Sequence, residues 1–384
     1  MRVYLDNNAS TAPDPAVIDA IARAMADLPG NSSSAHFAGR SADAAIENAR
    51  ETLGALLDCR AGSLVFTSGA TEANNLALVG LWEAQVGSAR RRRIVVSASE
   101  HPAILETAHH LAAQGAEVVT VPVTGAGAID LAYLDAVVNE DTLVVSVMAA
   151  NNETGVINPL AEVVRIAHSV GALAHTDATQ AIGRIPVSIN DLDIDLLSLS
   201  SHKMYGPKGV GALYVSRGIH VEPVLRGGGH ERGFRSGTLS TYDIVGFGVA
   251  ALLASQRLGE AERIAHLRDN FVTSAMKAIK GVTLNGLDSP RLPNTANLWF
   301  DGADAEAVMA GMPDIACSSG SACTAATQTP SHVLIAMGMS VQAASECLRF
   351  SLGRSTTENE LAYAVQQLAE SVEHVRHLST MSNA

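Results

Sequence analysis

The sequence predicts an α/β fold in which a mainly parallel, seven-stranded sheet is sandwiched by helices and joined to a smaller α+β lobe. Short, continuously apolar segments recur up to about residue 216, and segments with helical periodicity separate them. The pattern changes after about residue 250. Continuously apolar strands that alternate with helices are typical of parallel sheets buried on both faces.

Each expected element of the large lobe follows from this alternation. The segment Gly211–Ser216 follows a loop directly, without a crossover helix, which makes it a candidate antiparallel member of the sheet. Expected helices include 72–84, 102–114 and 159–170. The expected strands are 64–66, 93–99, 116–122, 142–150, 171–178, 193–200 and 211–216.

The remainder of the chain predicts the smaller lobe, whose sheet is a candidate to recruit the N-terminal segment. We expect a large cofactor-binding domain at 16–250, and a small domain made of 1–15 and 251–384 that carries a mobile cysteine loop. The expected elements are a long helix at 243–280, a strand at 294–300, a Gly/Ser-rich loop at 317–328, and helices at 330–338 and 358–377.

Composition excludes several classes of function. The net charge of −13 argues against a general nucleic-acid binder, so no direct nucleic-acid contact is expected. No apolar segment approaches the ~20 residues that span a bilayer, and residues 1–12 do not resemble a secretory signal. The four cysteines lack zinc-binding spacing, which predicts free thiols, no metal site and a cytoplasmic location.

The strongest chemical motif is the segment 200–209, SSHKMYGPKG, at the end of an expected buried strand. Ligands bind at strand ends in open α/β sheets, and a lysine there can form an imine with an aldehyde cofactor. Lys203 is therefore a candidate cofactor lysine. A surface lysine in a glycine-rich loop has comparable weight when this motif is considered alone.

Two further strand ends carry groups that suit such a cofactor. Asp177 could keep a pyridinium nitrogen protonated, although an isolated Asp is more often a helix N-cap. The segment 67–75 begins a helix with small and hydroxyl residues, and the amides of such a start suit a phosphate. A plain Ser/Thr cap with Glu72 in the first turn is the alternative.

Three other side chains complete the candidate site. His101 could stack on a flat cofactor and move protons, although a lone His is more often structural. Cys323 lies in a loop of small polar residues, which favours it as the nucleophile over Cys59 and Cys347 in helix-like segments. Cys317 is expected to be packed. Arg349 on an apolar strand needs an anionic partner, which is either a substrate carboxylate or an intramolecular acid.

Taken together, these motifs resemble the NifS/IscS group of cysteine desulfurases within the fold-type-I pyridoxal-phosphate enzymes. The resemblance covers almost the whole chain, and the order of its motifs is more specific than any one of them. Its further motifs are YLDNNAST (4–11), GNSSSAH (30–36), NNETG (151–155) and GGGHERGFRSGT (227–238).

The resemblance implies a role for each matching residue. Lys203 would bind pyridoxal 5′-phosphate, Asp177 would pair with its pyridine nitrogen, Gln180 would bind its ring oxygen, and His101 would stack on it. Asn152 and Arg349 would grip the substrate carboxylate, and Cys323, in a long mobile loop, would attack the substrate sulfur. Ala70, Thr71, Ser200 and His202 would hold the phosphate, and Thr238 would reach the phosphate of the partner subunit in a homodimer.

The implied activity is removal of sulfur from L-cysteine, which gives L-alanine and a persulfide on Cys323. A sulfur-acceptor protein is an expected partner, with iron–sulfur assembly, tRNA thiolation and DNA phosphorothioation all open. A selenocysteine lyase or an aminotransferase on the same fold is the alternative, and a non-catalytic binding protein is the third possibility. The chain departs from the group at His230, where Gln is common, and in lacking an extended aromatic-bearing tail after Ala384.

Overall fold

The computed structural model describes residues 1–85, 91–319 and 330–382. Its large sheet contains seven strands, as the sequence predicts. Six of them run parallel, and β8 runs antiparallel to both of its neighbours. The order across the sheet is β2 (Leu64–Thr67), β8 (Gly211–Val215), β7 (Leu196–Ser200), β6 (Leu173–Asp177), β5 (Thr142–Ser146), β3 (Arg93–Ser97) and β4 (Glu117–Val121).

Helices cover both faces of this sheet. Successive side chains of a strand point to opposite faces, so strands that are apolar throughout present apolar side chains on both. Val95 of β3 packs in one core, whereas its neighbours Ile94 and Val96 pack in the other. One core contains residues of α3 (Ala70–Glu83) and α4 (Pro102–Ala113). The other contains residues of α1 (Pro15–Asp27), α2 (Phe37–Leu57), α6 (Leu160–Ser169) and α8 (Thr241–Gln256). The short helices α5 (Leu131–Val137) and α7 (Ile189–Leu192) complete this lobe.

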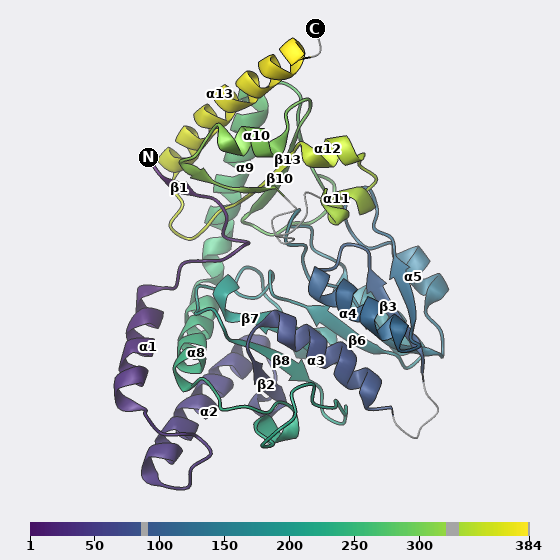
Figure 1. Ribbon diagram of the computed structural model, residues 1–384, viewed down its shortest axis with the longest axis vertical. Helices are drawn as coiled ribbons and strands as arrows, with labels where there is room; N and C mark the ends of the chain where they lie inside the picture. Colours follow the sequence, from purple (N-terminus) through teal and green to yellow (C-terminus); the bar gives the residue numbers. More distant parts are fainter. Residues whose placement is uncertain (86–90, 320–329, 383–384) are drawn as a thin grey trace.

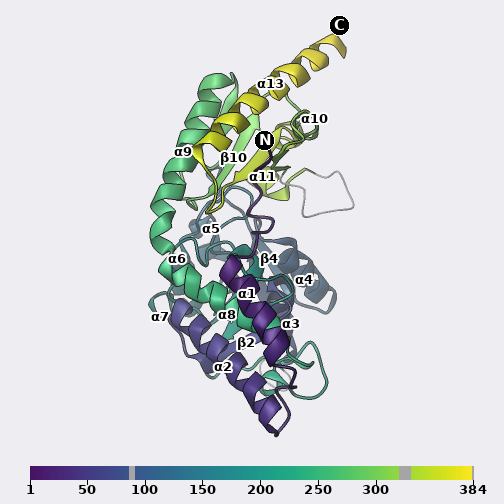
Figure 2. The same ribbon diagram turned by 90° about the vertical axis from the view of Figure 1, so that its left-hand side faces the viewer.

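A smaller antiparallel sheet forms the second lobe, which lies above the first in Figure 1. Its order is β12 (Ser318–Ser319), β13 (Cys347–Ser351), β10 (Thr295–Phe300) and β9 (Val282–Leu284). The accompanying helices are α9 (Ala261–Ala278), α10 (Ala305–Ala310), α11 (His332–Ala336), α12 (Val341–Ser345) and α13 (Glu358–Ser382). Figure 2 shows α9 and α13 side by side along one flank of this lobe.

The N-terminal segment lies beside the smaller lobe but does not add a strand to its four-stranded sheet. The strand β1 (Val3–Tyr4) pairs in parallel with β11 (Ile315–Ala316) in a separate two-stranded sheet. Asp6 then forms an isolated bridge with Ser351 at the end of β13. From there the chain passes to α1 in the large lobe, so residues 6–14 connect the two lobes (Figure 1).

The prediction of one long helix at 243–280 is wrong, because two helices occupy this region. The helix α8 ends at Gln256, a 3₁₀ turn covers Leu258–Glu260, and α9 begins at Ala261. The two helices belong to different cores: Ala254 packs with the large sheet, and Ile264 packs with the small one. We therefore propose that the division between the domains follows α8.

The expected helical positions of two cysteines are also wrong. Cys347 begins strand β13, because α12 ends two residues earlier at Ser345. Cys59 follows the end of α2, where Asp58 adopts a left-handed C-cap with a φ of 53°. None of the described helices has the length and apolar character needed to cross a membrane.

Candidate active site

The site lies at the carboxyl ends of the parallel strands, where α/β sheets bind ligands. Asp177 ends β6 and Ser200 ends β7, and both line a cavity of about 420 Å³. Arg349 and Thr238 do not line it. Cys323 lies outside the described residues. The predicted residues that line this cavity are Ala70, Thr71, His101, Asn152, Asp177, Gln180, Ser200, His202 and Lys203.

Lys203 is held at the cavity rather than free at the surface. It ends a 3₁₀ turn, Ser201–Lys203, that follows β7 directly. Its Nζ donates to the carbonyl oxygens of Asn8, at 2.5 Å, and Ala9, at 2.7 Å. The amine is half-buried, so the surface-lysine interpretation does not describe it. An amine fixed by two carbonyl oxygens beside a cavity can approach an aldehyde that enters there.

Asp177 is a buried carboxylate with only a small exposed fraction of 6%. One oxygen, Oδ2, accepts from Asn74 Nδ2 at 2.7 Å, and Oδ1 accepts from the amide of Thr179 at 2.9 Å. No α-helix begins at Asp177, which excludes the helix N-cap interpretation for it. Hydrogen bonds to both oxygens fix the orientation of this carboxylate at the cavity, where it can face a ring nitrogen.

The start of α3 is the segment that the sequence predicts as a phosphate site. Its N-cap is Gly69, with no hydrogen bond from a capping side chain, so the Ser/Thr cap alternative is not observed. An uncapped helix start leaves amide donors for an anion. Glu72 in the first turn is neutralised by Arg235 at 2.8 Å. Although burial acts to raise the pKa of Glu72, hydrogen bonds from Arg235 and Ser68 lower it.

Open space next to two glycines also fits a bound cofactor. Gly69, with a φ of 154°, and Gly209, with a φ of 82°, both line the cavity. No heavy atom lies within 4 Å of the position that a Cβ would take at either residue. Lys208 lies next to Gly209 and also lines the cavity, so a cation is available for an anionic group. Backbone without side chains allows close approach of a ligand.

His101 begins α4 and faces the cavity. Its Nδ1 accepts from the amide of Ala103 at 3.1 Å, which leaves Nε2 as the protonated nitrogen of a neutral ring. Burial lowers the pKa of His101; Asp177 acts to raise it, whereas Lys203 acts to lower it further. The imidazole is thus both a structural cap and a neutral ring available at the cavity.

Burial disfavours the charged forms of His202, which is half-buried, and of Glu100, which is fully buried. Burial, with Lys203 and Lys208, lowers the pKa of His202 to about 4. Burial raises the pKa of Glu100 well above its usual value, despite a hydrogen bond from the amide of Met148 at 2.6 Å. The side chain of Glu100 is completely buried, and its Oε2 has no partner among the described residues.

Asn8 connects the site to both lobes, and sequence reasoning did not assign it a role. Its Nδ2 donates to the carbonyl of Asn152 at 3.0 Å and to Thr295 Oγ1 at 2.9 Å. Its carbonyl oxygen accepts from both Gln180 Nε2, at 3.0 Å, and Lys203 Nζ. These partners are distant along the chain, so only the motif at residues 4–11 could have indicated it.

The loop that contains Thr238 explains the unusual His230. His230 Nδ1 accepts from the amide of Gly237 at 3.2 Å, and Gly229 N donates to Ser236 Oγ at 3.2 Å. A glutamine side-chain oxygen can accept in the same way, so His and Gln are physically compatible at this position. The result is a braced loop that leaves Thr238 exposed.

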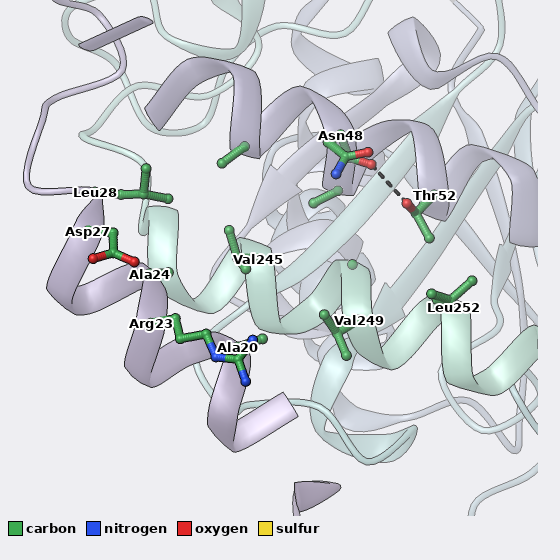
Figure 3. A pocket seen from close by; sticks show the side chains of 13 residues that line it. Ala20, Arg23, Ala24, Asp27, Leu28, Asn48, Thr52, Val245, Val249 and Leu252 are labelled. Carbon is green, nitrogen blue, oxygen red and sulfur yellow. Dashed lines mark hydrogen bonds between the residues drawn. The ribbon is translucent and has the colours of Figure 1, made fainter. Parts of the chain in front are cut away.

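A second hollow, of about 450 Å³, lies between α1, α2 and α8 (Figure 3). Its lining is mostly Ala, Val and Leu, with Arg23 and Asp27 as the charged side chains. Thr52 Oγ1 donates to the carbonyl of Asn48 within α2 at 2.9 Å, as the dashed line in Figure 3 marks. None of the site residues that the sequence predicts lines this hollow, whereas nine of them line the cavity at the strand ends.

Comparison with known protein families identifies the enzyme family to which the chain belongs. The model of the family described as Aminotransferase class-V matches residues 3–363. The chain belongs to this family. Class-V aminotransferases and their cysteine desulfurase relatives depend on pyridoxal phosphate, which confirms the predicted cofactor and the prediction of an enzyme.

The class-V relatives share nearly the full length of this chain. A protein named cysteine desulfurase IscS from Anaeromyxobacter sp. (strain Fw109-5) is 44% identical over 99% of this chain and 94% of its own. The cysteine desulfurase of Homo sapiens is 40% identical over 99% of this chain and 83% of its own. A solved structure described as a NifS-like protein has a TM-score of 0.90 and 36% identity, and covers 97% of this chain and 100% of its own. The predicted resemblance is confirmed.

Proposed function

We propose that this class-V enzyme is a cysteine desulfurase, which converts L-cysteine to L-alanine and places the sulfur on Cys323 as a persulfide. The observation that carries this is the convergence of Lys203 and Asp177 on one cavity beside the uncapped start of α3. The relatives named cysteine desulfurase, at 44% and 40% identity over 99% of the chain, favour this activity over the aminotransferase and selenocysteine lyase alternatives.

The residues present fit pyridoxal phosphate. Lys203 would hold its aldehyde carbon and Asp177 its ring nitrogen, and the start of α3 with Ser200, His202 and Lys208 would hold its phosphate. Gln180 would donate to its ring oxygen. When bound, the cofactor supplies an electron sink for carbanion chemistry at the substrate. Substrate binding, proton transfer and attack on the substrate sulfur would depend on groups of the protein.

The protein would hold the substrate by its carboxylate and move one proton. Asn152 and Arg349 would bind the carboxylate, Lys203 would transfer the proton, and His101 would stack on the ring with its Nε2–H available. The thiolate of Cys323 would then attack the substrate sulfur. The carbon–sulfur bond breaks, a sulfur–sulfur bond forms, and the carbon takes a proton to become the methyl group of alanine, so that the step needs no external oxidant or reductant.

The other three cysteines support Cys323 as the nucleophile. Burial is the largest cause that raises the pKa of Cys59, Cys317 and Cys347, in each case to about 12. A thiol with such a pKa has almost no thiolate at neutral pH. Cys323 is the remaining cysteine of the chain, and its small polar neighbours are those of an accessible thiol.

We further propose that two chains form a cytoplasmic homodimer, in which Thr238 of each chain reaches the phosphate of the other. The exposure of Thr238, and its absence from the lining of its own cavity, support a role toward a partner. A sulfur-acceptor protein would then take the persulfide sulfur. We expect the acidic chain to reach any nucleic acid through that partner rather than directly.

Incubation of the cofactor-loaded protein with L-cysteine and a reductant tests the activity. Equal amounts of alanine and sulfide support cysteine desulfurization. Transfer of the amino group to a keto acid without sulfide would instead establish an aminotransferase, and turnover of selenocysteine alone would establish a lyase. Purified protein that never acquires a visible cofactor band would contradict all three.

A further inference from the structure

Gln180 and Arg184 form a connected pair behind the cavity. Gln180 lines the cavity and has an exposed fraction of 5%. Arg184, four residues later, donates through Nη1 to both the backbone oxygen of Gln180, at 3.0 Å, and its side-chain Oε1. Arg184 Nη2 donates to the carbonyl of Asn7 at 3.1 Å. The guanidinium thus ties Gln180 to the N-terminal segment that crosses the site.

This pair determines which end of the Gln180 amide faces the cavity. A guanidinium has only donors, so the amide atom next to Arg184 must be the oxygen. A carbonyl oxygen only accepts, so the amide atom next to Asn8 must be the nitrogen. Without Arg184, the Asn8 carbonyl would be the amide's remaining restraint among the contacts described above, so the flipped amide would become more accessible.

The direction of this amide matters because of where Nε2 points. Gln180 Nε2 and Lys203 Nζ donate to the same oxygen, the carbonyl of Asn8. A ligand oxygen that enters beside the lysine nitrogen therefore meets an N–H donor, whereas a rotated amide would offer it a repelling oxygen. Among the described residues, the hydrogen-bond acceptors of Arg184 are three uncharged oxygens, so no carboxylate in contact cancels its positive charge.

We propose that Arg184 is a positioning residue, which locks the amide nitrogen of Gln180 toward the ring oxygen of the cofactor and adds a positive charge behind it. This inference rests on the proposed cofactor contact of Gln180. A donor at the ring oxygen stabilises its anionic form, and both this donor and a nearby cation make the adjacent Lys203 nitrogen release its proton more readily. Loss of Arg184 therefore raises the pH at which that nitrogen titrates.

The visible absorption of the cofactor-loaded protein reports this titration directly. We expect Arg184→Met to raise the pH midpoint of the visible band by about one unit, and to weaken cofactor binding by the reconstituted apoprotein about 10-fold. Arg184→Lys, which keeps a charged donor, should restore most of both properties. The other titratable or charged groups that line the cavity (Glu72, His101, Asp177, His202 and Lys208) are unchanged in these variants.

A double-mutant cycle with Gln180→Ala separates positioning from a merely structural role. Gln180→Ala alone should raise the midpoint, and addition of Arg184→Met should raise it much less than in the wild-type background. An equal shift in both backgrounds, or no shift on Arg184→Met alone, would overturn the inference. If Arg184→Met does not fold, Arg184→Gln replaces it in the same cycle, with the same expected dependence on Gln180.

The cycle also distinguishes this inference from the proposed function on which it rests. If Gln180→Ala leaves the midpoint and the cofactor affinity unchanged, the proposed contact between Gln180 and the ring is wrong. If Gln180→Ala shifts both and Arg184→Met shifts neither, the contact stands and only the role of Arg184 fails.

Discussion

Arg349 donates through Nη2 to Asp6 at 2.7 Å, and its Nε has no partner among the described residues. Its Nη1 donates to the carbonyl of Asn152 at 3.1 Å, and the side chain is almost completely buried. The intramolecular acid considered from the sequence is therefore present. We propose that the buried Nε, together with the plane of the guanidinium that Asp6 fixes, serves a substrate carboxylate.

We expect Arg349→Ala to raise KM for L-cysteine by about 10- to 100-fold, because hydrogen bonds to charged groups contribute about 1.5–3 kcal/mol. Arg349→Lys should recover only part of this, since lysine lacks the planar fork. Steady-state kinetics measure the change. The control is Arg2→Ala. Arg2 lies on the N-terminal segment that also carries Asp6, and its ion pair with Asp314, at 3.9 Å, is exposed. An unchanged KM in Arg349→Ala would exclude the carboxylate role.

Replacement of Cys323 should separate cofactor binding from sulfur transfer. We expect Cys323→Ala to keep the coloured cofactor and to lose persulfide formation, because no other thiol in the chain combines access with thiolate character. Mass spectrometry after incubation with cysteine detects the additional sulfur atom. Cys317→Ala is the matched control and should retain the persulfide, because burial raises the pKa of the Cys317 thiol to about 12. Normal sulfide release by Cys323→Ala would remove this residue from the mechanism.

The sequence predicts the large sheet well, because its signal is local. Continuous apolar segments indicate each strand, and polar residues at strand ends, such as Asp177 and Ser200, indicate the edge where they meet. The antiparallel β8 was also predictable, since its connection is too short for a crossover. The break between α8 and α9 was missed because it depends on which core each helix joins, and periodicity does not encode this.

The contacts that organise the site were much less predictable. Asn8, Arg184 and Glu100 act through partners that the folded chain brings together, such as Asn8 with Thr295. Their residue types are common, and although Asn8 lies in the motif at 4–11 and Glu100 precedes His101, the sequence does not show which partners they meet. The role expected of Asn152 came from the resemblance, and the apolar strand around Arg349 indicated an anionic partner for it. The contact of Arg349 with Asp6 required the position of β13 beside the N-terminal segment.

Replacement of Lys203 should abolish both the cofactor linkage and turnover. We expect Lys203→Ala to reduce turnover by about 10³-fold or more, since this amine both binds the aldehyde and transfers the proton. The absorption spectrum and alanine production measure the two effects. Lys277→Ala, an exposed lysine on α9, is the control and should behave as wild type. Robust multiple turnover by Lys203→Ala without an added amine would contradict the assigned role.

His175, which lies on β6 two residues before Asp177, should make the free energy of unfolding depend on pH. Its ring nitrogens contact Ser146 Oγ at 2.8 Å and Ser198 Oγ at 3.0 Å. Burial lowers the pKa of His175 to about 4, although Asp177 acts to raise it. Between about pH 4 and the unfolded pKa near 6.5, the unfolded chain therefore binds the proton that the folded chain excludes, so stability is lost as the pH falls through this range.

We expect His175→Gln, which can still form hydrogen bonds but cannot titrate, to reduce this loss by up to about 1.4 kcal/mol per pH unit between pH 6.5 and pH 4. Urea unfolding of the apoprotein at a series of pH values gives the slopes. His202, whose pKa also lies at about 4, should preserve part of the dependence in the variant. His220→Gln is the control, because the His220 side chain is 70% exposed. Identical slopes for wild type and His175→Gln would show that His175 is protonated in the folded protein as readily as in the unfolded chain.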